Sequence, residues 1–184
     1  MTDRQLLTQA ANGDEAAFQA LYERHRDPVY RLAWALTRSE ADAEEIVQDG
    51  FLTIVRKARE FRPEAASLRT WLLGVTRNLC YRRRGKVAAD EIGEPEEVSI
   101  DAGIEAALIR NQTAEAVRRA VTSLPEAQRE AIVLFDLEEL SLAETAAALG
   151  IDPNAVKARL HRGRARLKSI LPPLAAQRRP GSHE

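Results

Sequence analysis

Apolar residues between Asp3 and Gly85 recur every three or four positions, and no stretch of this segment alternates strictly between apolar and polar residues. This spacing predicts helices and no strands. Gly13 is expected to end a short first helix, and Asp14 is expected to cap the next one. Pro28 lies inside that second pattern, so we expect the helix to kink or restart there.

Two further helices follow in the same segment. Ser39 is a good cap for a long helix whose apolar face holds Ala43, Ile46, Val47, Gly50, Phe51, Ile54 and Val55. Its other face is acidic, which the pattern alone explains as ordinary solvent exposure. After a break from Phe61 to Ser67, the last helix is predicted from an apolar stripe of Leu68, Trp71, Leu72, Val75 and Leu79.

The polar side of this last helix combines an aromatic ring with several guanidinium groups. Thr70, Arg77, Tyr81 and Arg84 lie away from the apolar stripe. Aromatic stacking and phosphate contacts together favour single-stranded nucleic acid. The competing interpretations are a solvated basic helix end and a Trp71 that belongs to the core.

The segment from Ser141 to Lys168 has the pattern of two short helices joined by a tight turn. Ser141 and Glu144 have the spacing of a capping box, and Gly150 suits the left-handed position after a helix. Asp152 and Pro153 are typical of the cap and first position of the next helix. This arrangement predicts a helix-turn-helix.

The second of these helices is basic, with six Lys or Arg and no acid between residues 153 and 168. Val156, Leu160, Gly163 and Leu167 form a narrow stripe that is predicted to pack on the first helix. The opposite face would meet bases in the major groove, with cations on phosphates at its flanks. A solvated basic helix is the alternative. The face and its flanks consist of Asn154, Lys157, Ala158, Arg159, His161, Arg162, Arg164 and Arg166.

The overall composition hides a segregation of charge. The 184 residues carry 27 Lys and Arg against 28 Asp and Glu, and 45% of them are hydrophobic. Residues 62–86 and 153–168 are basic, whereas residues 87–105 contain seven acids and no base. Glycine and proline interrupt the acidic segment, so we interpret residues 87–108 as a linker between two helical domains.

Few other kinds of chemistry find support in the sequence. Cys80 is the sole cysteine and the three histidines are scattered, so no metal site, cofactor or histidine-based catalysis is expected. The chain has neither a long apolar run nor a signal-peptide pattern, which predicts a cytoplasmic protein. No nucleophile–base constellation can be drawn from its residues, so we do not expect an enzyme.

Three motifs precede the helix-turn-helix in a fixed order: DAEEIVQDGFLTIV from Asp42, SLRTWLLGVTRN from Ser67 and LPEAQREAIVL from Leu124. With these motifs, the chain resembles bacterial sigma factors of the extracytoplasmic function (ECF) group over about residues 5–170. The resemblance implies an all-α protein with a sigma-2 domain (1–86), the flexible acidic linker (87–108), a sigma-4 domain (109–171) and a disordered tail (172–184).

The same resemblance implies three interaction surfaces. The acidic helix would dock on the β′ clamp helices of RNA polymerase, and sigma-4 would meet the β flap; the clamp-binding residues would be Asp42, Glu45, Gln48, Asp49 and Phe51. The loop and helix from residue 62 to 84 would open the minus-ten element and hold an extruded base. These residues would be Arg62, Glu64, Ala65, Ser67, Arg69, Thr70, Trp71, Arg77, Asn78 and Arg84. The basic helix would read the minus-thirty-five element. An anti-sigma factor is also expected, between the domains or over their binding faces.

Two departures and two rival functions accompany the resemblance. Asn154-Ala155 stands where many relatives have Gly-Thr or Gly-Ser, and Cys80-Tyr81 stands where relatives often have an acid.

A stand-alone regulator would need a dimer interface and leaves the N-terminal motifs unexplained. A DNA enzyme such as a serine recombinase would need an α/β catalytic domain. The acidic linker is either a plain tether or a nucleic-acid mimic near the polymerase cleft.

Overall fold

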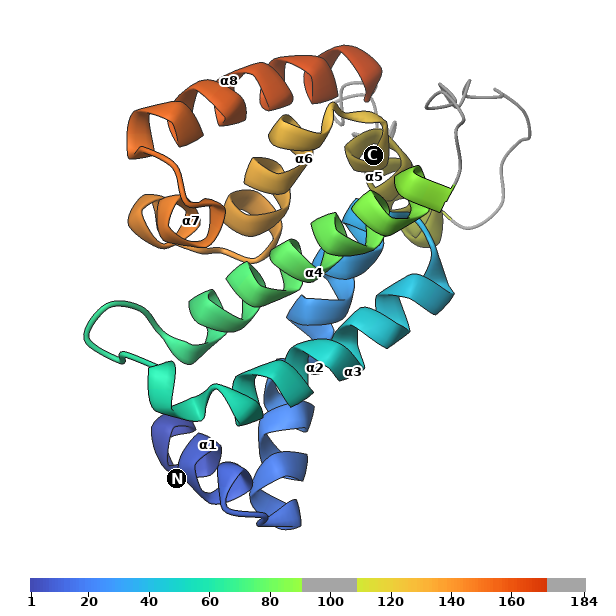
Figure 1. Ribbon diagram of the computed structural model, residues 1–184. Helices are drawn as coiled ribbons and strands as arrows, with labels where there is room; N and C mark the ends of the chain where they lie inside the picture. The colour runs from blue at the N-terminus through green and yellow to red at the C-terminus, as the bar shows by residue number, and fades with distance from the viewer. Residues whose placement is uncertain (91–108, 172–184) are drawn as a thin grey trace, which may run out of the picture.

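The computed structural model describes residues 1–90 and 109–171, and this part of the chain contains helices and no strands. Two groups of helices stack on each other (Figure 1). The lower group holds α1 to α4 and the upper group holds α5 to α8. The all-α architecture expected from the sequence is therefore confirmed.

The lower group follows the expected caps closely. Its elements are α1 (Asp3–Ala11), α2 (Glu15–Thr37), α3 (Glu40–Arg56), the short 3-10 helix η1 (Ala58–Glu60) and α4 (Leu68–Asp90). The side chain of Asp14 accepts a hydrogen bond from the Ala17 amide, and that of Ser39 accepts one from the Asp42 amide. Capping therefore sets the starts of α2 and α3.

The expected restart at Pro28 is wrong, because α2 is a single helix from Glu15 to Thr37. Pro28 is buried, and its neighbours Val29 and Leu32 are 1% and 0% exposed. The burial of this apolar face offsets the hydrogen bond that proline removes from a helix interior.

Helix α4 lies at the centre of the molecule. It buries Leu72, Leu73 and Cys80, which are all 0% exposed. One of its sides faces the upper group (Figure 1). The helix also extends to Asp90, so the first positions of the expected linker are helical. Residues 91–108 of that linker and the expected disordered tail lie outside the described residues.

The upper group consists of α5 (Ile109–Ser123), α6 (Glu126–Ile132), the π-helical turn η2 (Val133–Leu137), α7 (Leu142–Leu149) and α8 (Pro153–Ile170). The Ser141–Glu144 capping box is present, Gly150 has φ +65°, and the Asp152 side chain caps α8. The predicted helix-turn-helix is therefore confirmed in detail. Its core joins Leu124, Ile132 and Leu134 to Leu149, Val156 and Leu160.

Candidate nucleic-acid interface

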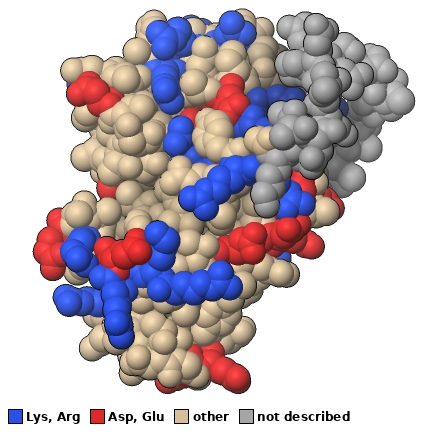
Figure 2. Space-filling model, viewed as in Figure 1, with Lys and Arg blue, Asp and Glu red and all other residues tan. Residues whose placement is uncertain are grey.

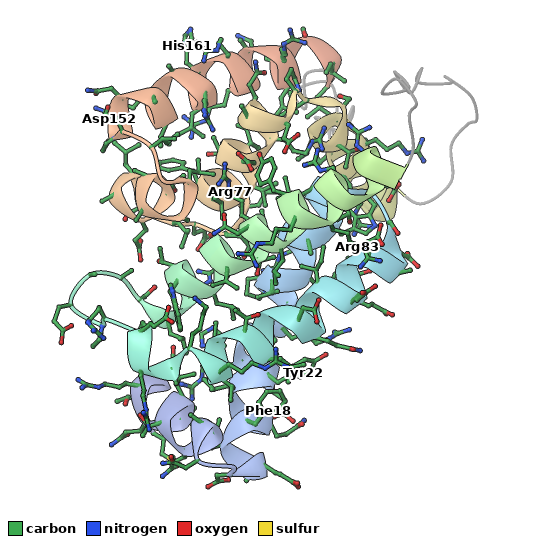
Figure 3. All side chains as sticks on the ribbon, in the orientation of Figure 1. Phe18, Tyr22, Arg77, Arg83, Asp152 and His161 are labelled. Carbon is green, nitrogen blue, oxygen red and sulfur yellow. The ribbon has the colours of Figure 1, made fainter. Side chains whose placement is uncertain are left out.

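Helix α8 presents its basic face outward at the top of the molecule, where Figure 3 shows His161 pointing away from the fold. Its apolar stripe is buried through Val156, Leu160 and Gly163. The stripe packs on α6 as well as on α7: a Cβ on Gly163 would lie 3.0 Å from Ile132 Cγ1. The expectation of packing on α7 alone is therefore incomplete. The residues that remain exposed on α8 include Asn154, Lys157, Ala158, His161, Arg162 and Arg166.

Two of the predicted phosphate contacts on α8 are engaged within the protein. Arg164 forms a two-point ion pair with Asp136, and this hydrogen bonding raises the pKa of its guanidinium. Arg159 turns inward, with Nη1 3.6 Å from Oε2 of the buried Glu130. The sequence pattern could not show these pairs because Glu130 in α6 and Asp136 in η2 meet α8 only through the fold.

On the side of α4 that faces the upper group, four of the predicted minus-ten residues lie against acidic side chains: Arg69, Thr70, Arg77 and Arg84. Arg69 Nη2 lies 2.8 Å from Glu138 Oε2, and Thr70 Oγ1 donates to Glu144 Oε1 at 3.2 Å. Further along the helix, Arg77 Nε donates to Glu130 Oε1 at 2.8 Å (Figure 3). The face thus binds carboxylates in this arrangement.

Tyr81 and Arg84, further along the same face of α4, also bind carboxylates of the upper group. Tyr81 donates its hydroxyl to Glu130 Oε1 at 2.6 Å, and Arg84 pairs with both oxygens of Glu126. Burial, with the hydrogen bonds to glutamate, raises the pKa of Tyr81. Partial burial alone would raise the pKa of Glu126, but the Arg84 hydrogen bonds outweigh it and lower that pKa. Glu126 is therefore bound in its charged form.

The loop before α4 keeps its polar groups exposed. Arg62, Glu64, Ala65 and Ser67 are exposed, and the Ser67 hydroxyl accepts a hydrogen bond from the Thr70 amide at 3.1 Å. Trp71 is half-buried and stacks on Phe61 with the ring centroids 5.4 Å apart. Asn78 helps to line a 280 Å³ cavity between α4 and α7. An aromatic platform therefore lies directly beneath the loop.

Three arginines near this loop were missed by the sequence reasoning. Arg4, Arg56 and Arg59 join Arg62 around a cavity of 590 Å³ whose floor includes Phe61. Lys and Arg side chains gather in this lower part of the molecule in Figure 2. The basic run from residue 56 to 62 was the available signal, but Arg4 reaches the group only through the fold.

The acidic face of α3 is partly neutralised. Arg83 Nε donates to Asp42 Oδ1 at 2.6 Å, and Arg83 Nη2 lies 2.7 Å from Glu45 Oε2 (Figure 3). Gln48 and Asp49 are exposed. Phe51 is different because it is 1% exposed and its ring lies 5.0 Å from that of Tyr22. The assignment of Phe51 to a polymerase-binding surface is therefore wrong: it is a core residue.

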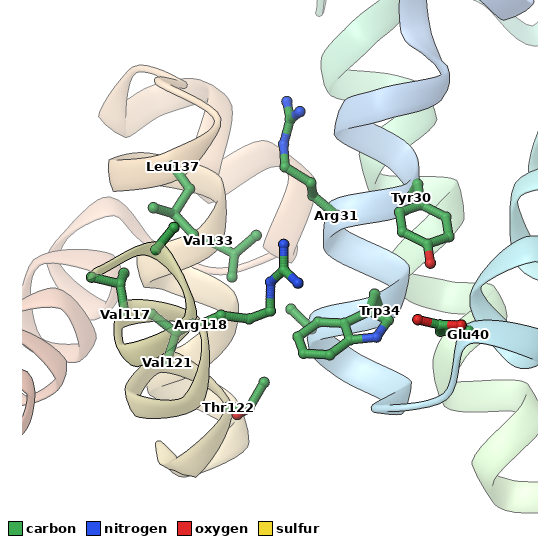
Figure 4. A pocket seen from close by; sticks show the side chains of 12 residues that line it. Tyr30, Arg31, Trp34, Glu40, Val117, Arg118, Val121, Thr122, Val133 and Leu137 are labelled. Carbon is green, nitrogen blue, oxygen red and sulfur yellow. The ribbon is translucent and has the colours of Figure 1, made fainter. Parts of the chain in front are cut away.

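A third cavity, of 560 Å³, opens between α2 and α5 (Figure 4). The Arg118 guanidinium lies 5.2 Å from the centre of the Trp34 ring at its edge. The walls are mostly apolar and come from Tyr30, Trp34, Ala35, Val117, Val121, Val133 and Leu137. The two helical groups are thus incompletely packed along this edge.

Features of other kinds of site are scarce within residues 1–90 and 109–171. No group of three or more His, Cys, Asp or Glu side chains there is placed to hold a metal ion. Nor does that part of the chain contain a helix suited to crossing a membrane. Cys80 is fully buried, and this burial raises the pKa of its thiol to about 12.

A helix-turn-helix with an exposed basic face, joined to a helical domain with an aromatic and arginine-rich helix, defines a DNA-binding transcription protein. Comparison with known proteins gives the family. The model of Sigma-70 region 2 matches residues 21–88, and that of Sigma-70, region 4 matches residues 114–167. We use region 2 for residues 1–90 and region 4 for residues 109–171 below.

The relatives agree with these matches. The chain is 37% identical over 170 residues to the ECF RNA polymerase sigma factor SigM of Mycobacterium tuberculosis, covering 92% of this chain and 85% of SigM. It is 34% identical to SigE of Mycolicibacterium smegmatis, over 88% of this chain and 65% of SigE. The chain belongs to the ECF sigma factors of the sigma-70 family, which bind RNA polymerase and direct it to promoters.

Solved structures support the same conclusion. CnrH in complex with the cytosolic domain of CnrY matches with a TM-score of 0.67 and 30% identity, covering 95% of this chain and 98% of CnrH. The sigma factor RpoE of Bartonella quintana, in complex with the anti-sigma factor NepR, matches with a TM-score of 0.66 and 27% identity, over 83% of this chain and 95% of RpoE.

Proposed function

We propose that this sigma factor reads the minus-thirty-five element with α8 and separates the strands of the minus-ten element with α4 and the loop before it. The exposed basic face of α8 carries the first assignment. Asn154, Lys157, Ala158, His161 and Arg162 would meet base edges, and Arg166 would meet phosphate. Arg159 and Arg164 would also contact phosphate after releasing Glu130 and Asp136.

At the minus-ten element, an extruded base would enter the exposed loop while the Phe61–Trp71 stack supports it from below. Arg69, Thr70, Arg77, Asn78 and Arg84 would hold the separated strand. Extrusion costs a few kcal/mol, which stacking and phosphate contacts offset. The cluster of Arg4, Arg56, Arg59 and Arg62 extends the basic surface beyond the loop, so we add it to this binding face.

For polymerase, the exposed Gln48 and Asp49 are our best candidates on α3, together with Asp42 and Glu45 once Arg83 releases them. The β′ clamp helices and the β flap would be the respective partners of region 2 and region 4. The extents of the two family matches support the division into domains at residues 1–86 and 109–171. The protein would work in the cytoplasm and would have no catalytic activity of its own.

We also propose control by an anti-sigma factor. CnrH and RpoE, which are similar to this chain over most of their length, are described in complexes with CnrY and with the anti-sigma factor NepR. A comparable partner would cover one or more of the surfaces assigned above. A stand-alone regulator is less well supported, because it gives no role to the acidic face of α3.

A direct test adds the purified chain to sigma-free core RNA polymerase with a panel of promoter fragments. We expect transcripts from promoters that carry both elements and none from fragments in which either element is scrambled. Tight promoter binding by the chain alone, without any promoter-specific transcript in the presence of polymerase, would instead support the regulator. Scrambling the two elements separately also tests the two reading surfaces one at a time.

A further inference from the structure

The 590 Å³ cavity of region 2 lies between α1 and the segment that ends α3 and continues through η1. Four of its lining residues are arginines, all with exposed side chains, and none is an aspartate or a glutamate. Figure 2 shows Lys and Arg side chains gathered in this part of the molecule. The four, which we call the arginine cluster, are Arg4, Arg56, Arg59 and Arg62.

The charges of the arginine cluster are not compensated within the described residues. None of its four members forms an ion pair with a carboxylate of residues 1–90 or 109–171. The adjacent Lys57, by contrast, pairs with Glu60 at 3.0 Å. Arg62 Nη1 donates to the backbone carbonyl of Arg59 at 2.8 Å, which positions the guanidinium without neutralising it. Four like charges therefore repel each other around one cavity.

The helices themselves account for only part of the arginine cluster. Arg56 lies in the last turn of α3, where a cation interacts favourably with the helix dipole. Arg4 lies in the first turn of α1, where the same dipole disfavours a cation. The fold thus brings a cation from an unfavourable helix position to three others. An anion bound in the cavity would explain this arrangement.

The rest of the cavity offers apolar surface and a few hydrogen-bonding groups. Its apolar lining includes Leu7, Val55 and Phe61, and its polar side chains include Thr8 and Asn12. The ring of Phe61 is held in place by its stack on a tryptophan of α4. A volume of 590 Å³ falls within the range of small-molecule sites, roughly 300–1,000 Å³. Such a lining suits a ligand with a flat ring as well as negative charge.

The number of charges distinguishes a free nucleotide from a nucleotide within a strand. A strand of DNA brings one negative charge per nucleotide. A nucleoside diphosphate or triphosphate brings about three or four, because its terminal phosphate is nearly doubly charged. Four guanidiniums around a cavity of one nucleotide's size match the second ligand. Arginine also binds phosphate through paired, charge-assisted hydrogen bonds.

We propose that this cavity is a binding site for a free nucleoside polyphosphate, with the phosphates on the arginine cluster and the base against Phe61. Phe61 and Arg62 also belong to the face that we assign to the minus-ten strand. The strand can therefore use the arginine cluster only while the nucleotide is absent. This consequence rests on the proposed function, whereas the binding site itself does not.

The test is isothermal titration calorimetry of ATP into the purified full chain. Arg4→Gln combined with Arg56→Gln should raise the Kd for ATP about tenfold, because an exposed ion pair contributes up to about fivefold to an affinity. Both side chains are exposed, so circular dichroism should show an unchanged fold. Lys57→Gln is the matched control: it removes an exposed cation next to Arg56 that does not line the cavity.

Two further ligands separate the contributions of the phosphates and the base. AMP should bind at least about tenfold more weakly than ATP, because it leaves most of the arginine cluster without a partner. Inorganic triphosphate should bind at least about fivefold more weakly than ATP, because it has no base to place against Phe61.

Two outcomes would overturn the proposal. In the first, the double arginine variant and Lys57→Gln bind ATP with the same Kd, so that ATP binds elsewhere on the chain. In the second, ATP does not bind, while the double arginine variant loses affinity for a single-stranded minus-ten oligonucleotide; the arginine cluster then serves the strand alone. These measurements need no polymerase, so transcription by the holoenzyme tests the proposed function separately.

Discussion

Glu138→Gln is the substitution for which the structure gives the sharpest expectation. The Glu138 carboxylate accepts hydrogen bonds from Arg31 at 2.6 and 2.9 Å and from Arg69 at 2.8 Å, and both arginines belong to region 2. The side chain therefore contributes to the contact between the regions and little to the stability of region 4 itself. The amide keeps the shape of the side chain but loses its charge.

The size of the effect can be estimated from these contacts. A hydrogen bond to a charged group contributes about 1.5–3 kcal/mol in a buried setting. The Arg31 and Arg69 side chains are 51% and 35% exposed, so solvent screens both pairs and reduces the loss. We expect the contact between region 4 and region 2 to weaken by about 2 kcal/mol, which corresponds to a roughly 30-fold shift toward chains in which Arg31 and Arg69 have left residue 138.

The assay is fluorescence anisotropy of a labelled minus-ten oligonucleotide titrated with the free chain. The apparent Kd should fall by up to about 30-fold, because Arg69 is free of residue 138 in a larger fraction of the chains and can bind the oligonucleotide. Glu139→Gln is the control: it makes the same chemical change at the next residue, which is exposed. Equal affinities for the Glu138→Gln and Glu139→Gln variants would refute the reasoning.

Three further predictions concern the reading helix and the lower core. Arg162→Ala should cost about 1–3 kcal/mol at one base of the minus-thirty-five element, measured by binding to single-base variants; equal weakening on every sequence would make Arg162 a phosphate contact. Gly163→Leu should lower the free energy of unfolding by about 1–3 kcal/mol or more in chemical denaturation, because Ile132 and Gln128 lie within 3.4 Å of an added Cβ. Gly85→Leu, in open space, should not, and a similar loss there would refute the packing argument. Burial lowers the pKa of His25 despite the nearby Asp3, so the unfolded chain takes up this proton more readily. The unfolding free energy should therefore fall as the pH drops below about 6.5, and His25→Gln should lose this contribution; an unchanged pH profile in that variant would contradict the assignment.

Local chemistry explains which parts of the fold could be predicted from the sequence. The Ser141–Glu144 capping box, the left-handed Gly150 and the Asp152 cap each depend on residues within one or two turns, and all are present. Pro28 misled the prediction because its cost in the helix is offset by burial against distant helices. The spacing of Phe51 placed it on the apolar face of α3, and only the resemblance assigned it to the polymerase surface; its burial and its contact with Tyr22 agree with the spacing.

The candidate site could likewise be predicted only where residues close in sequence determine it. The composition of α8 and α4 was sufficient to select both basic helices. The partners of their arginines were not predictable, because Glu130 and Glu138 meet α4 only through packing between segments about 50 to 70 residues apart. The Arg4 contribution to the lower basic cluster is hidden for the same reason.

The central claim is that this chain directs RNA polymerase to promoters whose two elements it reads with α8 and α4. The most direct measurement is transcription by core polymerase, with and without the purified chain, from one promoter and from copies in which either element is scrambled. We predict transcripts only when the chain is present and only from the intact promoter. Equal transcript yields from the intact and scrambled promoters would contradict the account.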